Sequence, residues 1–537
     1  MLRQLPSVVG IIRISFYFAV AVLLASCTTH ANEDSNSKSN ATAKKKDEPK
    51  TKSAFPDPAP PELLKVGDRP TPTPKPYERV TFRKKPKPLP KGAVTHNWTK
   101  FLGPTHNAIS TETKLLKKWP KSGPQLVWEL EKGSKRDVSY SSPAIQDEFL
   151  VVPHRVTDQV FVECLHPETG QLYWQFKFPT KYRDRYQYGN GPRASPVISD
   201  GRVYIYSAEG NLYCLKLTTG QLYWKRELFK EFNVQQDFFG VVTTPLVQGN
   251  LLIINVGAPD GPSVIGLNKT DGKVVWGSSN SKGSNKWAAS YASPVPALIH
   301  GQRRVFVFAG GDSQPPTGGL LCLDPANGHV DFEFPWRSRT YESVNASCPV
   351  VINNQVFISA TYRRGSTLLK IDSDFSATPV WKTSDREHNT REDQLGLHWN
   401  TAVYKDGHLY AFDGRNEPDA SLVCVDVKTG KVVWREIPEW DEKAVINGQA
   451  YDVGATLRGS LLSVDGQFLC LGELGHLMWL ELSPRGYKEL ARTRLFLAPQ
   501  SWALPIISRG LLYISQNQPA MLTGNPTRLL CYDLRGQ

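Results

Sequence analysis

The stretch CLHPETGQLYW, at residues 164–174, recurs four more times along the chain and decides the fold. Each copy has the pattern of a strand, a tight turn with glycine, and a second strand carrying Trp or Phe. Glycine suits the turn because it adopts positive φ without strain. The further copies are CLKLTTGQLYW (214–224), GLNKTDGKVVW (266–276), CLDPANGHVDF (322–332) and CVDVKTGKVVW (424–434).

A second signature precedes each of these motifs. Small residues, usually followed by Pro, open an alternating strand, a polar turn and another strand, as in ASPVISDGRVYIY (194–206). Two hairpins in a repeat of about fifty residues make one four-stranded antiparallel unit, and units at this period predict a β-propeller. We therefore expect an all-β fold over residues 97–537, an eight-bladed propeller with blades starting near residues 141, 194, 243, 292, 346, 401, 456 and 503.

The two ends of the repeat region complement each other. The last repeat stops at CYDLRGQ (531–537), before its outermost strand, while QLVWEL (125–130) matches KVVWRE (431–436). We expect the N-terminal strand to complete the last blade and so remove an open edge. The predicted structural docking residues, at the turn glycines and the following tryptophans, are Gly170, Trp174, Gly220, Trp224, Gly272, Trp276, Gly430, Trp434 and Trp128.

Five of the eight cysteines occupy one equivalent position, at the end of the third strand of a blade. Packed sheets lie roughly 10 Å apart, whereas a disulfide needs Cα atoms within about 7 Å. We therefore interpret these residues as small buried side chains and predict neither disulfides nor a metal site. They are Cys164, Cys214, Cys322, Cys424 and Cys531.

The N-terminus has the pattern of a bacterial lipoprotein signal. Arg3 and Arg13 flank a short apolar core, and LASC (24–27) places small residues before a cysteine. We predict a signal peptide over residues 1–26 and lipidation of Cys27, which anchors the protein to a membrane. A single transmembrane anchor is the alternative, but the apolar core is short for a bilayer. Residues 27–96 are rich in Lys and Pro without apolar periodicity, which predicts a disordered tether.

The positive charge lies mainly outside the repeat region. The formal net charge is +13, of which residues 1–96 contribute +9 and residues 97–537 only +4. A basic groove that neutralises phosphates is therefore not expected, and we predict no nucleic-acid partner.

The motif A-x-D-x-x-T-G-x-x-x-W is the tryptophan-docking motif of quinoprotein dehydrogenases, matched most nearly at residues 164–174 and 424–434. Over residues 97–537 the chain resembles the PQQ-binding-like β-propeller repeat proteins, which include the outer-membrane assembly factor BamB and the quinoprotein alcohol dehydrogenases. The resemblance implies a propeller whose docking motif packs blades together and holds no cofactor. By analogy with BamB, it also implies a cell-envelope location on the periplasmic face of the outer membrane.

Long connections are expected on one face of the ring, between strands two and three and between blades. Residues just before the innermost strands would surround the mouth of the central channel on this face, where rigid sheets display loops for binding. The candidate binding residues are Tyr140, Arg193, Tyr291, Asn345, His398, Asn400, Arg458 and Trp502. Packing among the loops is the competing interpretation for each of them.

Three functions remain open. The leading prediction is a non-catalytic envelope scaffold that binds a protein partner on the long-loop face. The first alternative is a quinoprotein oxidoreductase with PQQ and Ca²⁺; the resemblance then implies a Glu, Asn and Asp calcium site and often two adjacent cysteines, a pair that this sequence lacks. The second alternative is a propeller that binds a sugar or a peptide. We predict no cofactor for the scaffold, and no haem, zinc-protease or phosphate-loop motif occurs.

Overall fold

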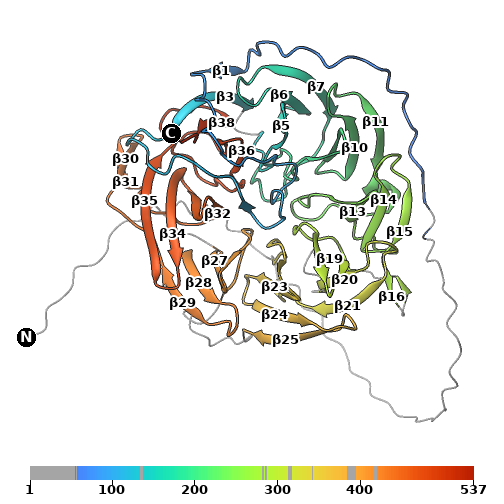
Figure 1. The fold of residues 1–537 in the computed structure, drawn as a ribbon. Helices are drawn as coiled ribbons and strands as arrows, with labels where there is room; N and C mark the ends of the chain where they lie inside the picture. Colours follow the sequence, from blue (N-terminus) through green and yellow to red (C-terminus); the bar gives the residue numbers. More distant parts are fainter. Residues whose placement is uncertain are drawn as a thin grey trace, which may run out of the picture.

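The computed structural model describes residues 55, 57–133, 137–280, 283–284, 287–311, 317–340, 343–383, 395–415 and 420–536. The predicted signal peptide, Cys27 and the first part of the predicted tether lie outside these residues. Eight antiparallel sheets are arranged in a ring (Figure 1), and this confirms the predicted eight-bladed β-propeller. Within the described residues, no helix has the length and apolar character needed to cross a membrane.

Each blade is built from consecutive strands, ordered from the channel outward. The first blade contains β4 (Ala144–Gln146), β5 (Phe149–Val156), β6 (Gln159–Leu165) and β7 (Leu172–Pro179), and the second contains β8 (Val197–Ser199), β9 (Arg202–Tyr206), β10 (Asn211–Lys216) and β11 (Leu222–Glu227). The third blade contains β12 (Leu246–Gln248), β13 (Leu251–Asn255), β14 (Val264–Asn268) and β15 (Val274–Gly277). The fourth contains β18 (Val295–Ile299), β19 (Gln302–Ala309), β20 (Gly319–Leu323) and β21 (Val330–Pro335).

The next three blades follow the same order. The fifth blade contains β22 (Val350–Ile352), β23 (Gln355–Ala360), β24 (Gly365–Ile371) and β25 (Ala377–Lys382). The sixth contains β26 (Val403–Lys405), β27 (His408–Asp413), β28 (Ser421–Asp426) and β29 (Val432–Glu436). The seventh contains β32 (Gly459–Val464), β33 (Gln467–Gly472), β34 (His476–Ser483) and β35 (Gly486–Arg494). Outside the blades, the described residues include one short helix, α1 (Leu228–Glu231), and two small hairpins, β16 (Ser279–Asn280) with β17 (Gly283–Ser284) and β30 (Lys443–Ile446) with β31 (Gln449–Asp452).

The last blade combines strands from both ends of the described chain. It contains β36 (Ile506–Ser508), β37 (Leu511–Gln516) and β38 (Thr527–Asp533), and β3 (Gln125–Gly133) pairs antiparallel with β38. Trp128 on β3 lies opposite Cys531, the position that the sequence predicted for it. A further strand, β1 (Val80–Phe82), pairs with the outer side of β3. The strand pair that closes the ring therefore joins residues that are about 400 positions apart in the sequence.

Neighbouring blades are held together by tryptophans. The Trp174 indole on β7 donates a hydrogen bond to the carbonyl of Leu217 at 2.7 Å and packs over Gly220 in the next blade. Trp128, Trp224, Trp276 and Trp434 donate in the same way to carbonyls of the following blade. Trp381 does so too, with its ring on Gly430, although the turn of its own blade lacks the Thr-Gly signature and the sequence analysis missed it. The cysteines of the described residues are all free and buried.

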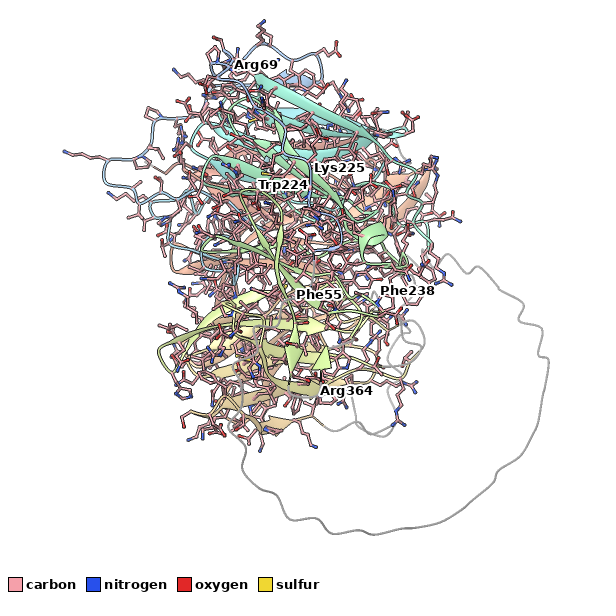
Figure 2. All side chains as sticks on the ribbon, turned by 90° about the vertical axis from the view of Figure 1, so that its right-hand side faces the viewer. Phe55, Arg69, Trp224, Lys225, Phe238 and Arg364 are labelled. Carbon is pink, nitrogen blue, oxygen red and sulfur yellow. The ribbon has the colours of Figure 1, made fainter. Side chains whose placement is uncertain are left out.

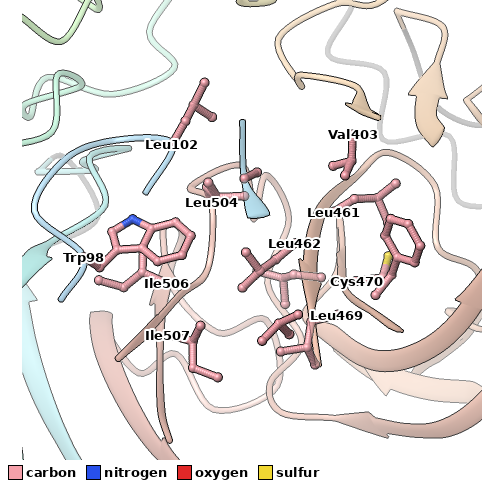
Figure 3. Packing of buried hydrophobic residues seen from close by; sticks show 14 of the residues in the cluster. Trp98, Leu102, Val403, Leu461, Leu462, Leu469, Cys470, Leu504, Ile506 and Ile507 are labelled. Atoms are coloured by element: carbon pink, nitrogen blue, oxygen red, sulfur yellow. The ribbon is translucent and has the colours of Figure 1, made fainter. Parts of the chain in front are cut away.

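One end of the channel is closed by residues 97–110, which we call the plug. Trp98 forms a β-bridge with Ile145 of β4 in the first blade, and β2 (Ile109–Ser110) runs parallel to β32 in the seventh blade, two blades away around the ring. Trp98 is 1% exposed and packs among the innermost strands beside Leu504 and Ile506 (Figure 3). The plug was not predicted, because its aromatic and small residues show no strand or helix periodicity.

Residues 57–84, which we call the strap, lie against the outer edges of four blades (Figure 1). Leu64 donates to the carbonyl of Tyr223 on β11, Lys75 bridges Leu172 on β7, and β1 extends the last blade. Asp57 pairs at 2.8 Å with Arg226, whose side chain is fully buried. The sequence predicted a disordered tether up to residue 96, and the structure differs here because strand edges supply hydrogen bonds that a Pro-rich segment cannot make within itself.

Candidate functional site

A continuous group of aromatic rings surrounds the channel mouth on the face opposite the plug, and we call it the aromatic rim. Tyr140 stacks on Trp502 with ring centroids 5.1 Å apart, and Tyr188 contacts Trp502 at 5.6 Å and Phe239 at 6.0 Å. Phe239 in turn contacts Tyr291 at 5.3 Å. The members are Tyr140, Tyr186, Tyr188, Phe238, Phe239, Tyr291, Trp399 and Trp502.

The rim residues come from the connections that lead into the blades. Each such connection ends where an innermost strand begins, and the innermost strands line the channel. Tyr140 precedes the first blade, Tyr188 lies between the first two, and Trp502 precedes the last. Figure 2 shows the ring from its side, with Phe238 near one face and Phe55 of the N-terminal segment on the side of the ring. The blades thus bring together aromatic residues separated by as many as 362 positions, from Tyr140 to Trp502.

Two arginines reinforce the rim, and each is paired with a buried carboxylate. Arg193 donates to Asp184 at 2.6 Å and lies 5.0 Å from the ring centre of Tyr140. Arg458 forms two hydrogen bonds of 2.9 Å with Glu473 and lies 4.9 Å from the ring centre of Trp502.

Hydrogen bonds fix these groups further. Glu473 also accepts from the Trp502 indole at 2.8 Å, and the Tyr140 hydroxyl donates to Gln500 at 2.6 Å. A cation over a ring is worth about 0.5–2 kcal/mol, more where water is excluded. The network therefore holds the rim rigid, and its buried carboxylates are already neutralised by arginine.

The eight predicted binding residues divide into two groups. Tyr140, Arg193, Tyr291, Arg458 and Trp502 belong to the rim network. Asn400 lies below it, 8% exposed, and its amide donates to the carbonyl of Phe412 at 2.9 Å.

His398 and Asn345 have other surroundings. His398 is hydrogen-bonded to the Tyr362 hydroxyl at 2.9 Å, and burial, followed by the nearby Arg458 and Arg415, lowers the pKa of His398 to about 3. Its imidazole is therefore neutral at physiological pH. Asn345 is fully buried and donates to the carbonyls of Ala309 and Trp336, so it supports the loops and does not face the mouth.

Sequence reasoning missed Tyr188, Phe239, Asp184 and Glu473. The segment KYRDRYQY (181–188), with aromatic and charged residues at alternating positions, was the available signal for two of them. Glu473 follows β33 and carries no distinguishing local pattern, so only the folded ring reveals its pairing with Arg458.

The space under the rim is small. A cavity of about 30 Å³ lies between the rim and the plug, with Trp399, Asn400 and Trp502 on one side and Phe101 and Leu102 on the other. This is room for about one or two water molecules. Among the described residues, no group of three or more His, Cys, Asp or Glu side chains is placed to hold a metal ion.

The fold and the matching family model define a β-propeller of the PQQ-like class. A family model described as "Outer membrane protein assembly factor BamB" matches residues 159–436, and the chain belongs to this family. Quinoprotein ethanol dehydrogenase of Pseudomonas putida is 25% identical over 255 residues, which is 45% of this chain and 40% of that protein. The chain therefore spans well under half the length of this curated relative.

Two solved structures share the fold. A europium-containing methanol dehydrogenase matches with a TM-score of 0.54 at 12% identity, covering 82% of this chain and 98% of that chain. Quinohemoprotein alcohol dehydrogenase from Comamonas testosteroni matches with a TM-score of 0.55 at 12% identity, covering 82% of this chain and 81% of that one. At this identity the likeness concerns the fold alone.

Proposed function

We propose that the protein is a non-catalytic scaffold of the cell envelope that binds a protein partner at the aromatic rim. One observation carries the proposal: the rim exposes Tyr186 and Tyr188 on a platform of aromatic rings that is held by the largely buried Arg193 and Arg458, whose carboxylate partners are already paired. Tyr, Trp and Arg are the residues most enriched at the energetic centres of protein interfaces. Tyr188 is 38% exposed although its ring rests on Trp502 and Phe239, so it is a preorganised contact.

The location belongs to the same proposal. We propose that Cys27 carries a lipid that anchors the protein at the periplasmic face of the outer membrane. The test is fractionation of cells that produce Cys27→Ala, with a matched Thr28→Ala control. Release of only the Cys27 variant from membranes supports the anchor, and retention of both variants contradicts it.

The binding experiment is affinity capture from envelope extracts with wild-type protein and Tyr188→Ala. Truncation of a hot-spot tyrosine costs about 2 kcal/mol or more in affinity, so the partner is expected to be lost or strongly depleted. The control is the double variant Arg485→Ala/Lys488→Ala, two exposed cations at the outer hairpin of the seventh blade. Equal recovery of the partner by all three proteins would contradict the proposal.

A quinoprotein oxidoreductase is the second candidate, favoured by the similarity to quinoprotein ethanol dehydrogenase. Its cofactor would need calcium ligands and room for a flat tricyclic ring. We rank this candidate second because Glu473 and Asp184 of the described mouth are bound to arginines and the cavity beside Trp502 measures about 30 Å³. Reconstitution with PQQ and Ca²⁺ followed by dye reduction tests this candidate. Dye reduction that depends on both additions would favour it over the scaffold.

A further inference from the structure

A belt of hydrogen bonds joins the innermost strands of neighbouring blades around the channel. In each of the first five blades, the residue two positions before the innermost strand donates its backbone N–H to the side chain at the same position of the next blade. Ser142 donates to Ser195 at 3.1 Å, and Ser195 donates to Thr244 at 3.2 Å. The bonds of the next three blades follow the same rule. The belt residues of the first six blades are Ser142, Ser195, Thr244, Ser293, Cys348 and Thr401.

The belt is interrupted at the seventh blade. The registers of β26 with β27 and of β32 with β33 place Ser460 at the position that Thr401 has in the sixth blade. Among the described residues, however, no hydrogen bond links Thr401 to Ser460 or Ser460 to the eighth blade. Direct bonding resumes where the Ser142 hydroxyl donates to the carbonyl of Leu504, the equivalent residue of the eighth blade, at 2.7 Å. The break therefore spans the sixth to eighth blades.

The cavity of about 30 Å³ between the rim and the plug lies at this break, since Thr401, Ser460 and Leu504 all line it. Leu102 of the plug, Leu461 and Leu504 form apolar parts of its wall (Figure 3). None of the lining residues carries a charge. A missing connection between blades and a small enclosed space thus coincide.

Two residues that line the cavity carry buried polar atoms without a hydrogen-bond partner among the described residues. They are the indole Nε1 of Trp399 and the amide Oδ1 of Asn400. Asn400 is 8% exposed, and its amide nitrogen is already bonded to the carbonyl of Phe412 at 2.9 Å. An unpaired polar atom in such a place is costly unless the cavity supplies its partner.

The chemistry of these groups is complementary to water. The indole donates, the amide oxygen accepts, and the hydroxyls of Thr401 and Ser460 do either. An internal water makes about two to four hydrogen bonds and needs roughly 10–15 Å³ of such space. The cavity is too small for a larger ligand, and its uncharged lining disfavours an ion.

We infer that one or two ordered water molecules bind in this cavity and complete the belt across the seventh blade. Their partners are Trp399 Nε1, Asn400 Oδ1 and the Ser460 hydroxyl. Water at this site also connects the rim, through Trp399, with the closed end of the channel. The inference is independent of the proposed scaffold function.

The first test is a crystal structure of the full chain at a resolution that shows ordered water. We expect a density peak in the cavity at about 2.7–3.2 Å from at least two of the three named atoms. A cavity without a peak, or a peak beyond hydrogen-bond distance of all three atoms, would overturn the inference.

The second test compares Ser460→Ala with Ser515→Ala by urea unfolding. Both serines are 3% exposed, and the Ser515 hydroxyl also lacks a partner but does not line the cavity. We expect Ser460→Ala to lower the urea midpoint by about 0.2–0.5 M, because the water loses a partner. Ser515→Ala should leave the midpoint unchanged or raise it, because it removes an unpaired buried hydroxyl. Equal midpoints for the two variants would show that Ser460 holds no water and would overturn the bridge.

Discussion

The contact between Gly220 and Trp174 allows the docking of one blade on the next to be measured. Gly220 has a φ of 69°, and a Cβ built on it would lie 2.5 Å from the Trp174 ring. Gly201, in another turn of the same blade, has the same φ of 69° but no atom within 4 Å of such a Cβ. The substitutions Gly220→Ala and Gly201→Ala therefore share the backbone strain and differ in the contact with the indole.

The expected magnitudes follow from these two effects. An L-residue in the left-handed region costs about 1–2 kcal/mol, and this is the whole effect expected for Gly201→Ala. Forcing a methyl group into a packed contact adds about 1–3 kcal/mol. The Trp174 ring cannot easily retreat, because its indole is hydrogen-bonded to Leu217 at 2.7 Å. We expect Gly220→Ala to lose about 2–5 kcal/mol of unfolding free energy in total.

The assay is urea unfolding followed by tryptophan fluorescence, with the two variants and wild type compared at one protein concentration. A lower midpoint with an unchanged slope reports stability and not a change in the surface exposed on unfolding. If Gly220→Ala and Gly201→Ala shift the unfolding free energy by the same amount, within about 0.5 kcal/mol, the indole contact does not carry blade docking and the reasoning is wrong.

Three further predictions concern the strap, the plug and a buried ion pair. Asp57→Ala leaves the fully buried Arg226 with Glu231 as its remaining carboxylate, so we expect strap docking to weaken by about 1–3 kcal/mol. Tryptic cleavage after exposed Lys65 of the strap should then be faster than in wild type, and exposed Asp68→Ala is the control. Equal cleavage rates in the two variants would contradict this. Trp98→Ala removes a 1% exposed indole from the plug and is expected to lower the free energy of unfolding, measured with urea, by about 3–5 kcal/mol. A decrease of less than about 1 kcal/mol would show that the plug does not stabilise the ring. Glu442 accepts a hydrogen bond from His476, which lowers the pKa of Glu442 from 4.5 to about 2. The ionised carboxylate therefore adds to the free energy of unfolding above pH 4.5, and this contribution is lost as the pH falls toward 2. Glu442→Gln should reduce the fall in unfolding free energy between pH 4.5 and pH 2 by about 1–2 kcal/mol, whereas exposed Glu439→Gln should leave it unchanged.

Local patterns in the sequence were sufficient for the blades. Alternating strands, glycine turns such as that at Gly170 and the tryptophan four residues later are properties of neighbouring residues, and they repeat often enough to set the number of blades. The position of Trp128 on the last blade followed from the same pattern, because an outer strand was missing at one end and present at the other.

The rim, the plug and the strap depend on contacts between distant residues. Tyr140, Tyr188 and Trp502 meet only because closure of the ring brings interblade connections to one point. Asp57 and Tyr77 lie in a segment whose composition is typical of disorder, and only the edges of the blades offer them Arg226 and Glu163 as partners. The sequence by itself determined the repeated unit, since hydrophobic alternation and turn chemistry are local. Tertiary structure decided which side chains face one another across the channel, since that depends on the closure of all eight blades.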